Sequence, residues 1–314
     1  MSGEQKLVEP KLEVVGQIQP IWYYPLSKLI QLSPSRSVGY SYEAESQMLQ
    51  RASAFVRVLA ERLNELRQTE RVSNLCITVA LIRLRRFFLV HSFADFDPCD
   101  VGTAALFLSS KSEECPTRLE MIILVSYRLR VELECPPNEW ETTSILTKAQ
   151  CKVFCDYMVW NENMMLQTVG FELEITVPHT SVILLCEHYK KPKKFSETVY
   201  WMTTDRLLVT FSSWHLCFSH HHTDWCVRYR PKTVACIVFY VGSVWAQEPL
   251  PKSINNISWY EDFYDLADDP LDERILADLA IEYTKILNTS KQNGILALET
   301  TSSTLNIQGL KVFE

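Results

Sequence analysis

Hydrophobic residues recur at spacings of three and four along most of the chain, which is the pattern of amphipathic helices. The first long stripe lies in residues 43–66 and contains Met48, Ala52, Phe55, Leu59, Leu63 and Leu66. The residues off this stripe, as a polar face requires, are Arg51, Arg57, Glu61 and Arg62. Further helical patterns predict helices over residues 75–91, 101–111, 118–130 and 147–168.

After Val177 and Pro178 the helical pattern begins again. It predicts helices over residues 180–189 and 199–215, separated by a lysine-rich break at 190–194. Pro231 is predicted at the first position of another helix, where its missing N–H costs nothing. Asp269 and Pro270 are predicted to start a last amphipathic helix that ends near Ile286. No segment carries a convincing strand pattern.

Two predicted helices, at residues 101–111 and 233–240, are apolar almost all round. A helix with so little polar surface must be buried by neighbours on every side. Each is the third long helix of its half, so the sequence predicts an all-α fold of two helical domains, each wrapped around a buried central helix. We expect a polar leader at 1–20, a first domain with a preceding helix at 21–175, a second domain at 176–290 and a polar tail at 291–314.

Composition supports this fold and excludes several kinds of function. A chain of 314 residues fits two domains of about 150 residues each. It contains only 8 glycines in 314 residues, well below the roughly 7% that is usual. No two of them lie closer together than Gly3 and Gly16. Glycine-rich phosphate loops and nucleophile elbows are therefore absent, which excludes a kinase, a GTPase or a dehydrogenase.

Net charge and cysteine content argue against further classes of protein. The net charge of −7 argues against a general nucleic-acid binder, so no direct DNA binding is expected. The 10 cysteines include no CxxC pair, and the first residues are too charged for a signal peptide. We interpret them as reduced thiols of an intracellular protein. The longest apolar run, Val234 to Ala246, is shorter than the ~20 residues of a membrane span, and no membrane association is expected.

A series of short motifs resembles the cyclin family, and among its members the transcriptional cyclins, cyclin T above all. The motifs in the first half are SPSR at 33–36, RFF at 86–88 with HSF at 91–93, ALFLSSKSEE at 105–114, and LQTVGFEL at 166–173 continuing into PHT at 178–180. Those in the second half are YRP at 229–231, VAC at 234–236 and WYE at 259–261. Each motif alone is weak, but their order and spacing together are specific.

The resemblance implies two tandem cyclin-box domains of about five helices each. It also implies a regulatory subunit without catalytic residues, cofactor or metal. Such a subunit binds a cyclin-dependent kinase and moves the kinase's αC helix into its active position. For a protein that resembles cyclin T, the expected partner is the kinase of positive transcription elongation factor b. This kinase phosphorylates the C-terminal repeats of RNA polymerase II. The expected location is the nucleus.

The resemblance also assigns kinase-binding residues. Lys111 matches the family's lysine at the end of the buried helix, and Glu162 matches its acidic partner on a later helix. Phe107, Phe171 and Leu173 match apolar docking positions, and Glu114 matches a further contact. From residue type alone, Lys111 is more often a solvated lysine at the helix C-terminus. Phe107 is equally compatible with plain core packing, and Glu114 with a simple acidic helix end.

The sequence departs from the family pattern at several places. Arg85-Arg86 stands where the family has histidine and arginine, and Ser109, Ser110 and Ser112 stand where it has small apolar residues. A cluster of His215, Cys217, His220, His221, His222 and Cys226 looks metal-rich. Its spacing is irregular, so an exposed loop is the favoured interpretation and no metal is predicted.

Three alternatives remain open at the level of sequence. The lysine run at 190–194 is either a nuclear-import signal or a solvated loop, which is the more common case. A cyclin-fold general transcription factor, or a scaffold without kinase activation, is a second functional class. The acidic charge balance and the missing zinc ribbon count against the transcription factor. A helical enzyme using Cys217 and His215 is a third, and the i, i+2 spacing of these two residues counts against it.

Overall fold

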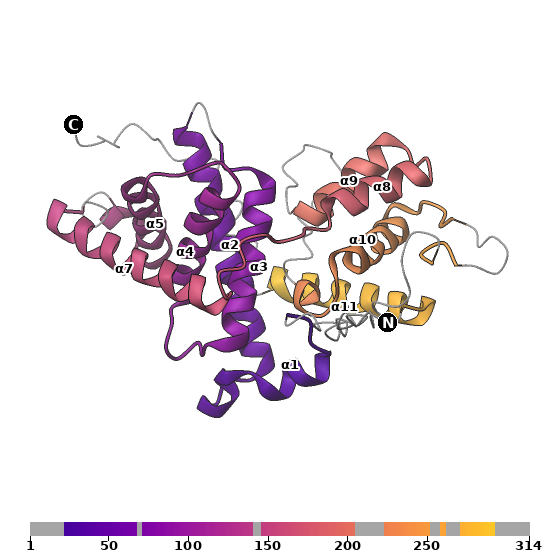
Figure 1. The fold of residues 1–314 in the computed structure, drawn as a ribbon, viewed down its shortest axis with the longest axis horizontal. Helices are drawn as coiled ribbons and strands as arrows, with labels where there is room; N and C mark the ends of the chain where they lie inside the picture. The colour runs from indigo at the N-terminus through magenta and orange to yellow at the C-terminus, as the bar shows by residue number, and fades with distance from the viewer. Residues whose placement is uncertain are drawn as a thin grey trace, which may run out of the picture.

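The computed structural model of the chain describes residues 22–67, 71–140, 146–204, 223–251, 258–261 and 271–292. Its first half contains α1 (Leu26–Leu32), η1 (Pro34–Val38), α2 (Tyr42–Leu66), α3 (Asn74–Val90), α4 (Pro98–Ser112), α5 (Leu119–Glu134), η2 (Pro137–Glu139) and α7 (Lys148–Thr168). Its second half contains α8 (His179–His188), α9 (Lys193–Thr204), η4 (Trp225–Val227), α10 (Pro231–Ala246) and α11 (Glu273–Gln292). Within the described residues every regular element is helical, and the predicted all-α fold of two tandem domains is confirmed (Figure 1).

Helix α4 is the central helix of the first domain, as its apolar sequence predicts. It packs against α2, α3, α5 and α7, and all residues from 101 to 110 are buried. Gly102 allows its closest approach to α2, because a Cβ atom there would lie 2.6 Å from a methyl group of Val56. This packing on every side fixes the position of the helix and of Lys111 near its C-terminal end.

Helix α10 has the same role in the second domain. It packs against α8, α9 and α11, and the residues from 233 to 239 are all buried. Pro231 is its first residue, as predicted. Gly242 again marks a close approach, since a Cβ atom there would lie 2.7 Å from a methyl group of Val199 on α9. Both halves are thus organised around one buried helix.

The two domains meet along a small apolar seam with polar bonds beside it. Ile82 of α3 packs with Cys226 and Val227 of η4. The N–H of Tyr24 donates to the carbonyl of Val227 at 2.9 Å, and the hydroxyl of Tyr42 donates to Asp224 at 2.9 Å. The segment before α1 and the start of α2 therefore hold the second domain against the first.

Some details of the sequence prediction need correction. Arg57, assigned to the polar face of α2, is only 6% exposed. Helix α9 begins at Lys193 rather than at 199, with Ser196 N–H donating to the Pro192 carbonyl at 3.0 Å. The predicted end at 215 and the predicted start at Asp269 lie outside the described residues. Asp272 accepts a bond from Ile275 N–H at 2.6 Å and thereby caps α11.

The lysine-rich break before α9 is only partly solvated. The Lys191 side chain is 8% exposed, and its ammonium donates to the carbonyl of Pro249 and lies 5.3 Å from the centre of the Phe195 ring. Lys190, Lys193 and Lys194 remain exposed. One lysine of the run therefore has a structural role. Among the described helices, none has the length and apolar character that a bilayer-spanning segment needs.

Candidate functional site

Lys111 and Glu162, predicted from different helices to act together, form an ion pair in the structure. Lys111 lies in the last turn of α4, where its charge favours the negative end of the helix dipole. Glu162 lies on α7, which packs against α4. The Lys111 side chain is 44% exposed and that of Glu162 is 9% exposed. The pair thus leaves the lysine side chain partly exposed and the glutamate side chain nearly buried.

Phe107 lies one turn before Lys111 and is 8% exposed. Its ring belongs to the core of the first domain, and the Lys111 ammonium lies 4.2 Å from the ring centre. A cation over an aromatic face gains about 0.5–2 kcal/mol, depending on desolvation. The Phe107 ring therefore has two roles. It packs in the core of the first domain and it stabilises the Lys111 ammonium.

The end of α7 turns Phe171 and Leu173 out to the surface. The helix ends in a Schellman motif, in which Phe171 N–H donates to the Leu166 carbonyl at 2.9 Å and Gly170 N–H to the Gln167 carbonyl at 3.1 Å. Gly170 and Phe171 both have positive φ, 63° and 61°. Phe171 is 67% exposed and Leu173 is 42% exposed. We call the group of Lys111, Glu162, Phe171 and Leu173 the Lys111 edge.

A fully buried arginine connects the two halves of the Lys111 edge. Arg83 of α3 is 0% exposed; its guanidinium donates to Ser109 Oγ at 2.7 Å, to Ser112 Oγ at 3.1 Å and to the carbonyl of Leu173 at 2.8 Å. Burial lowers the pKa of Arg83. Two of the three serines that depart from the family pattern, Ser109 and Ser112, thus accept hydrogen bonds from an arginine of α3. The sequence interpretation missed this link.

A second arginine of α3 holds the residue between Phe171 and Leu173. Arg86 lies 3.9 Å from a carboxylate oxygen of Glu172, and its guanidinium lies 5.1 Å from the centre of the Trp22 ring. The indole N–H of Trp22 also donates to Glu172 at 3.2 Å. Trp22, which lies just before α1, therefore helps to fix the Lys111 edge.

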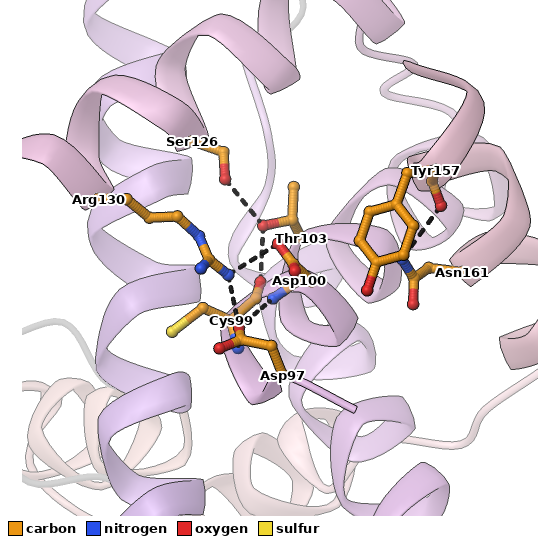
Figure 2. Close-up of polar contacts among 8 residues, drawn as sticks. All are labelled: Asp97, Cys99, Asp100, Thr103, Ser126, Arg130, Tyr157 and Asn161. Atoms are coloured by element: carbon orange, nitrogen blue, oxygen red, sulfur yellow. Dashed lines mark hydrogen bonds and ion pairs between the residues drawn. The ribbon is translucent and has the colours of Figure 1, made fainter. Parts of the chain in front are cut away.

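The N-terminal end of α4 is also held by hydrogen bonds and ion pairs (Figure 2). Asp97 caps the helix by accepting from the N–H groups of Cys99 at 2.9 Å and Asp100 at 3.0 Å. Arg130 reaches over from α5 and donates to Asp97 at 2.5 Å and to Asp100 at 2.7 Å. Burial raises the pKa of Asp100 to about 6, an effect that the Arg130 charge opposes. Helix α4 is thus fixed at both ends, which limits the motion of Lys111.

The sixth predicted residue, Glu114, lies apart from this network. It is exposed, follows the end of α4 and has a φ of 56°. Among the described residues, no ion pair joins Glu114 to the other five. The structure therefore places Glu162 and Phe107 in contact with Lys111. Arg83 connects Leu173 to the end of α4. Glu114 lies outside this group of contacts.

In the described residues, a cavity lies away from the six predicted residues, and no group of side chains is suited to bind a metal ion. A cavity of about 240 Å³ lies between α1, α2, α3 and η4, and none of the six predicted residues lines it. Within the described ranges no group of three or more His, Cys, Asp or Glu side chains could hold a metal ion. Of the metal-rich cluster only Cys226 is described; it is buried in the seam between the domains.

Comparisons with known proteins agree with the fold. Residues 37–174 match the family model "Cyclin, N-terminal domain", and residues 177–286 match "Cyclin-T2-like, C-terminal domain". The protein is therefore of the tandem cyclin-box class. Cyclin-T of Drosophila melanogaster is 32% identical over 241 residues, or 76% of this chain, and human Cyclin-T1 is 30% identical over 85% of it. The chain belongs to the cyclin family and, within it, is similar to the cyclin T proteins.

Solved structures show the same architecture at low sequence identity. A chain of the yeast RNA Pol II CTD kinase CTDK-1 complex aligns with a TM-score of 0.60 and 11% identity, covering 93% of this chain and 86% of that one. A chain of the yeast TFIIK complex aligns with a TM-score of 0.52 and 15% identity, covering 85% of this chain and 96% of that one. The chain spans only 19% of the Drosophila relative and 32% of human Cyclin-T1.

Proposed function

We propose that this protein is a regulatory subunit that binds and activates a transcriptional cyclin-dependent kinase. Its kinase would be of the positive transcription elongation factor b type, acting in the nucleus on the C-terminal repeats of RNA polymerase II. The observation that carries the proposal is the Lys111–Glu162 ion pair at the end of the buried helix α4. Similarity to the cyclin T proteins supports the kinase class.

The Lys111 edge has the chemistry of a protein-docking surface. A lysine ammonium has three donor hydrogens, and the Lys111 side chain is 44% exposed while it pairs with Glu162. It can therefore still donate to backbone carbonyls at a helix end of a partner. Phe171 and Leu173 are exposed apolar side chains, and a few side chains that become fully buried at the centre of an interface contribute most of its binding energy.

The contribution to catalysis would be conformational. An active protein kinase needs an ion pair between its β3 lysine and its αC glutamate, which together hold the ATP phosphates. A rigid cyclin surface against αC favours the kinase conformation that contains this pair. The rigidity comes from α4, which is buried along residues 101–110 and capped at its start by Asp97.

The experiment is affinity capture from nuclear extract with the full chain, followed by mass spectrometry and by a kinase assay on a polymerase heptad-repeat peptide. We expect a cyclin-dependent kinase and heptad phosphorylation. Lys111→Ala should reduce both, while the matched control Lys232→Ala, an exposed lysine in the first turn of α10, should reduce neither.

Two results would contradict the proposal. Capture of a promoter complex without kinase activity would instead favour the general transcription factor class. Capture of an active kinase that Lys111→Ala retains fully would show that docking uses another surface of the protein.

A further inference from the structure

The cavity of about 240 Å³ lies where the two domains meet. Residues of α1, α2 and α3 line it from the first half of the chain, and Asp224 and Val227 line it from the second half. An engineered protein cavity of about 150 Å³ holds a benzene molecule, so this cavity has room for a two-ring aromatic compound. Ligand sites also occur preferentially at interfaces between domains.

Most of the cavity lining is apolar or aromatic. Phe88 of α3 and Phe93, in the loop after α3, are stacked on each other, with ring centres 3.9 Å apart and ring planes inclined by 3°. The N–H of Phe93 donates to Ser35 Oγ at 3.0 Å, which fixes this loop. A flat aromatic molecule can pack against such rings in an offset or edge-to-face arrangement. Other apolar side chains of the lining are Leu29, Leu49, Leu89 and Val227.

The two carboxylates of the lining already have partners in the protein. Glu45 of α2 is 7% exposed and pairs with Arg36 at 2.7 Å. Asp224 pairs with Arg228 at 2.9 Å and accepts a hydrogen bond from the Tyr42 hydroxyl at 2.9 Å. Neither Arg36 nor Arg228 lines the cavity. Both negative charges are therefore engaged by cations that lie outside the lining.

Lys28 of α1 differs from these carboxylates. It lines the cavity and is exposed, so it lies where the cavity is open to solvent. Within the part of the chain that the structure describes, Lys28 takes part in no ion pair. Its ammonium has three donor hydrogens. Lys28 is therefore a charged group of the lining that can pair with an incoming anion.

We propose that this cavity binds a small aromatic molecule that carries one carboxylate group. The ring system packs among the apolar side chains of both domains, and the carboxylate pairs with Lys28. Arg85, which also lines the cavity and is 4% exposed, adds a second positive charge to its walls. Because the ligand contacts both domains, its binding stabilises their junction. The inference does not depend on the proposed function, since none of the six predicted docking residues lines the cavity.

Cationic and neutral ligands fit these walls less well. A cationic ligand meets the charges of Lys28 and Arg85, and the carboxylates that could receive it are engaged by Arg36 and Arg228. A neutral aromatic ligand uses the apolar walls but leaves Lys28 to water. The difference in affinity between an aromatic acid and its amide therefore measures the part of the binding that comes from the charge.

Ligand-observed NMR titration of the full chain with indole-3-acetate and with its neutral amide, indole-3-acetamide, tests the site. For a two-ring ligand we expect a dissociation constant of about 1 mM or lower for the acid. A partly solvated ion pair changes affinity by up to about fivefold, so we expect the amide to bind about threefold more weakly. The acid should also raise the melting temperature as its concentration rises. An acid that does not bind, or an amide that binds as tightly, would overturn the proposal.

Matched lysine variants test the role of the charge. Lys28→Met removes the ammonium but keeps an unbranched side chain. It should weaken binding of indole-3-acetate to the level of the amide and leave binding of the amide unchanged. Lys152→Met, at an exposed lysine of α7, should change neither. A Lys28→Met protein that binds the acid as the wild type does would overturn the pairing with Lys28.

Ser46→Phe tests the cavity itself. Ser46 of α2 lines the cavity, so a phenyl ring at this position should occupy the space of the ligand and abolish measurable binding of both probes. Circular dichroism shows whether the variant is folded, and Leu49→Phe, at another lining residue of α2, supplies a second filled cavity. Full binding of both probes to a folded, filled variant would place the ligand elsewhere and overturn the proposal.

Discussion

At the scale of single residues, the Lys111 edge combines a predictable part with an unpredictable one. Lys111, Glu162 and Phe107 could be chosen from motif register, and the structure places them in contact. Arg83 could not, because its acceptors lie 26 and 29 residues away on another helix and 90 residues away at Leu173. The signal was present only as two unusual serines, and no local pattern connects them to a cation on α3.

Phe171 offers a test in which stability and binding change in opposite directions. A non-glycine residue in the left-handed region costs roughly 1–2 kcal/mol, and Phe171 has a φ of 61° and is 67% exposed. Phe171→Gly should therefore raise the free energy of unfolding by about 1 kcal/mol while weakening kinase binding. Urea unfolding and a binding assay measure the two effects.

The matched control is Phe171→Ala, which removes the ring but keeps the strained backbone. It should weaken binding as much as the glycine variant does and leave stability near that of the wild type. A glycine variant that binds the kinase as the wild type does would remove Phe171 from the docking surface.

His179 gives the molecule a defined response to acid. It is 2% exposed at the start of α8, and burial lowers its pKa to about 4 from 6.5. Between these values the unfolded chain binds a proton that the folded protein does not, so stability falls as the pH falls. From pH 7 to pH 5 we expect His179 to account for a loss of about 2 kcal/mol. His179→Gln should remove this part of the loss in urea unfolding, whereas His188→Gln, on the exposed last turn of the same helix, should keep it.

At the scale of helices, the prediction from sequence worked where apolar spacing was long and regular. The central helices α4 and α10 were recognisable because a helix without a polar face has to be buried, and both are. The prediction was weaker where tertiary contacts decide. Arg57 looks solvent-facing along α2 yet is buried. The sequence pattern of one helix does not reveal which of its sides other parts of the fold cover, and α2 packs against α3, α4 and α5.

Gly102 shows why the central helix needs a residue without a side chain. Its missing Cβ would lie 2.6 Å from the Val56 methyl group, and a β-branched side chain in a helix has almost no other rotamer to adopt. Alanine would gain about 1 kcal/mol in helix propensity but would cost roughly 1–3 kcal/mol by overpacking. We expect Gly102→Ala to lower the free energy of unfolding by about 1 kcal/mol.

Chemical denaturation measures this effect, and the double variant Gly102→Ala with Val56→Ala supplies the control. Removing the Val56 methyl groups makes room for the new side chain, so alanine at 102 should be less harmful in that background. An equal cost in both backgrounds would show that the close approach of α4 to α2 is not the cause.

At the scale of the whole molecule, the two domains are joined by few but specific bonds. Arg228 pairs with Asp224 at 2.9 Å and with Glu282 of α11 at 2.8 Å, and Asp224 accepts from Tyr42 of the first domain. Tandem domains were evident from the repeated apolar helix, but this junction was not, because it joins residues 182 positions apart.

Tyr42→Phe tests how much the junction contributes. The change removes one hydrogen bond to a charged acceptor, which typically contributes about 1.5–3 kcal/mol. Asp224 keeps its bond to Arg228, so we expect a loss near the lower end of that range. Scanning calorimetry should show a lower unfolding temperature. A thermogram identical to that of the wild type would mean that the Tyr42–Asp224 bond adds no stability beyond the apolar seam and the Tyr24–Val227 backbone bond.

Docking of the kinase through the charge of Lys111 is tested most directly by the dissociation constant of the kinase complex for a charge swap, Lys111→Glu with Glu162→Lys. The swap keeps an ion pair between α4 and α7 but reverses the charge that the partner meets. We predict a dissociation constant raised about tenfold or more, or 1.4 kcal/mol, measured at a temperature where the variant is folded. The melting temperature should fall, because the swap removes the cation over the Phe107 ring and puts a negative charge at the C-terminal end of α4. The same swap in the exposed pair Lys193–Glu197 of α9 should leave binding unchanged. A swapped Lys111 edge that binds the kinase as tightly as the native one would contradict the account.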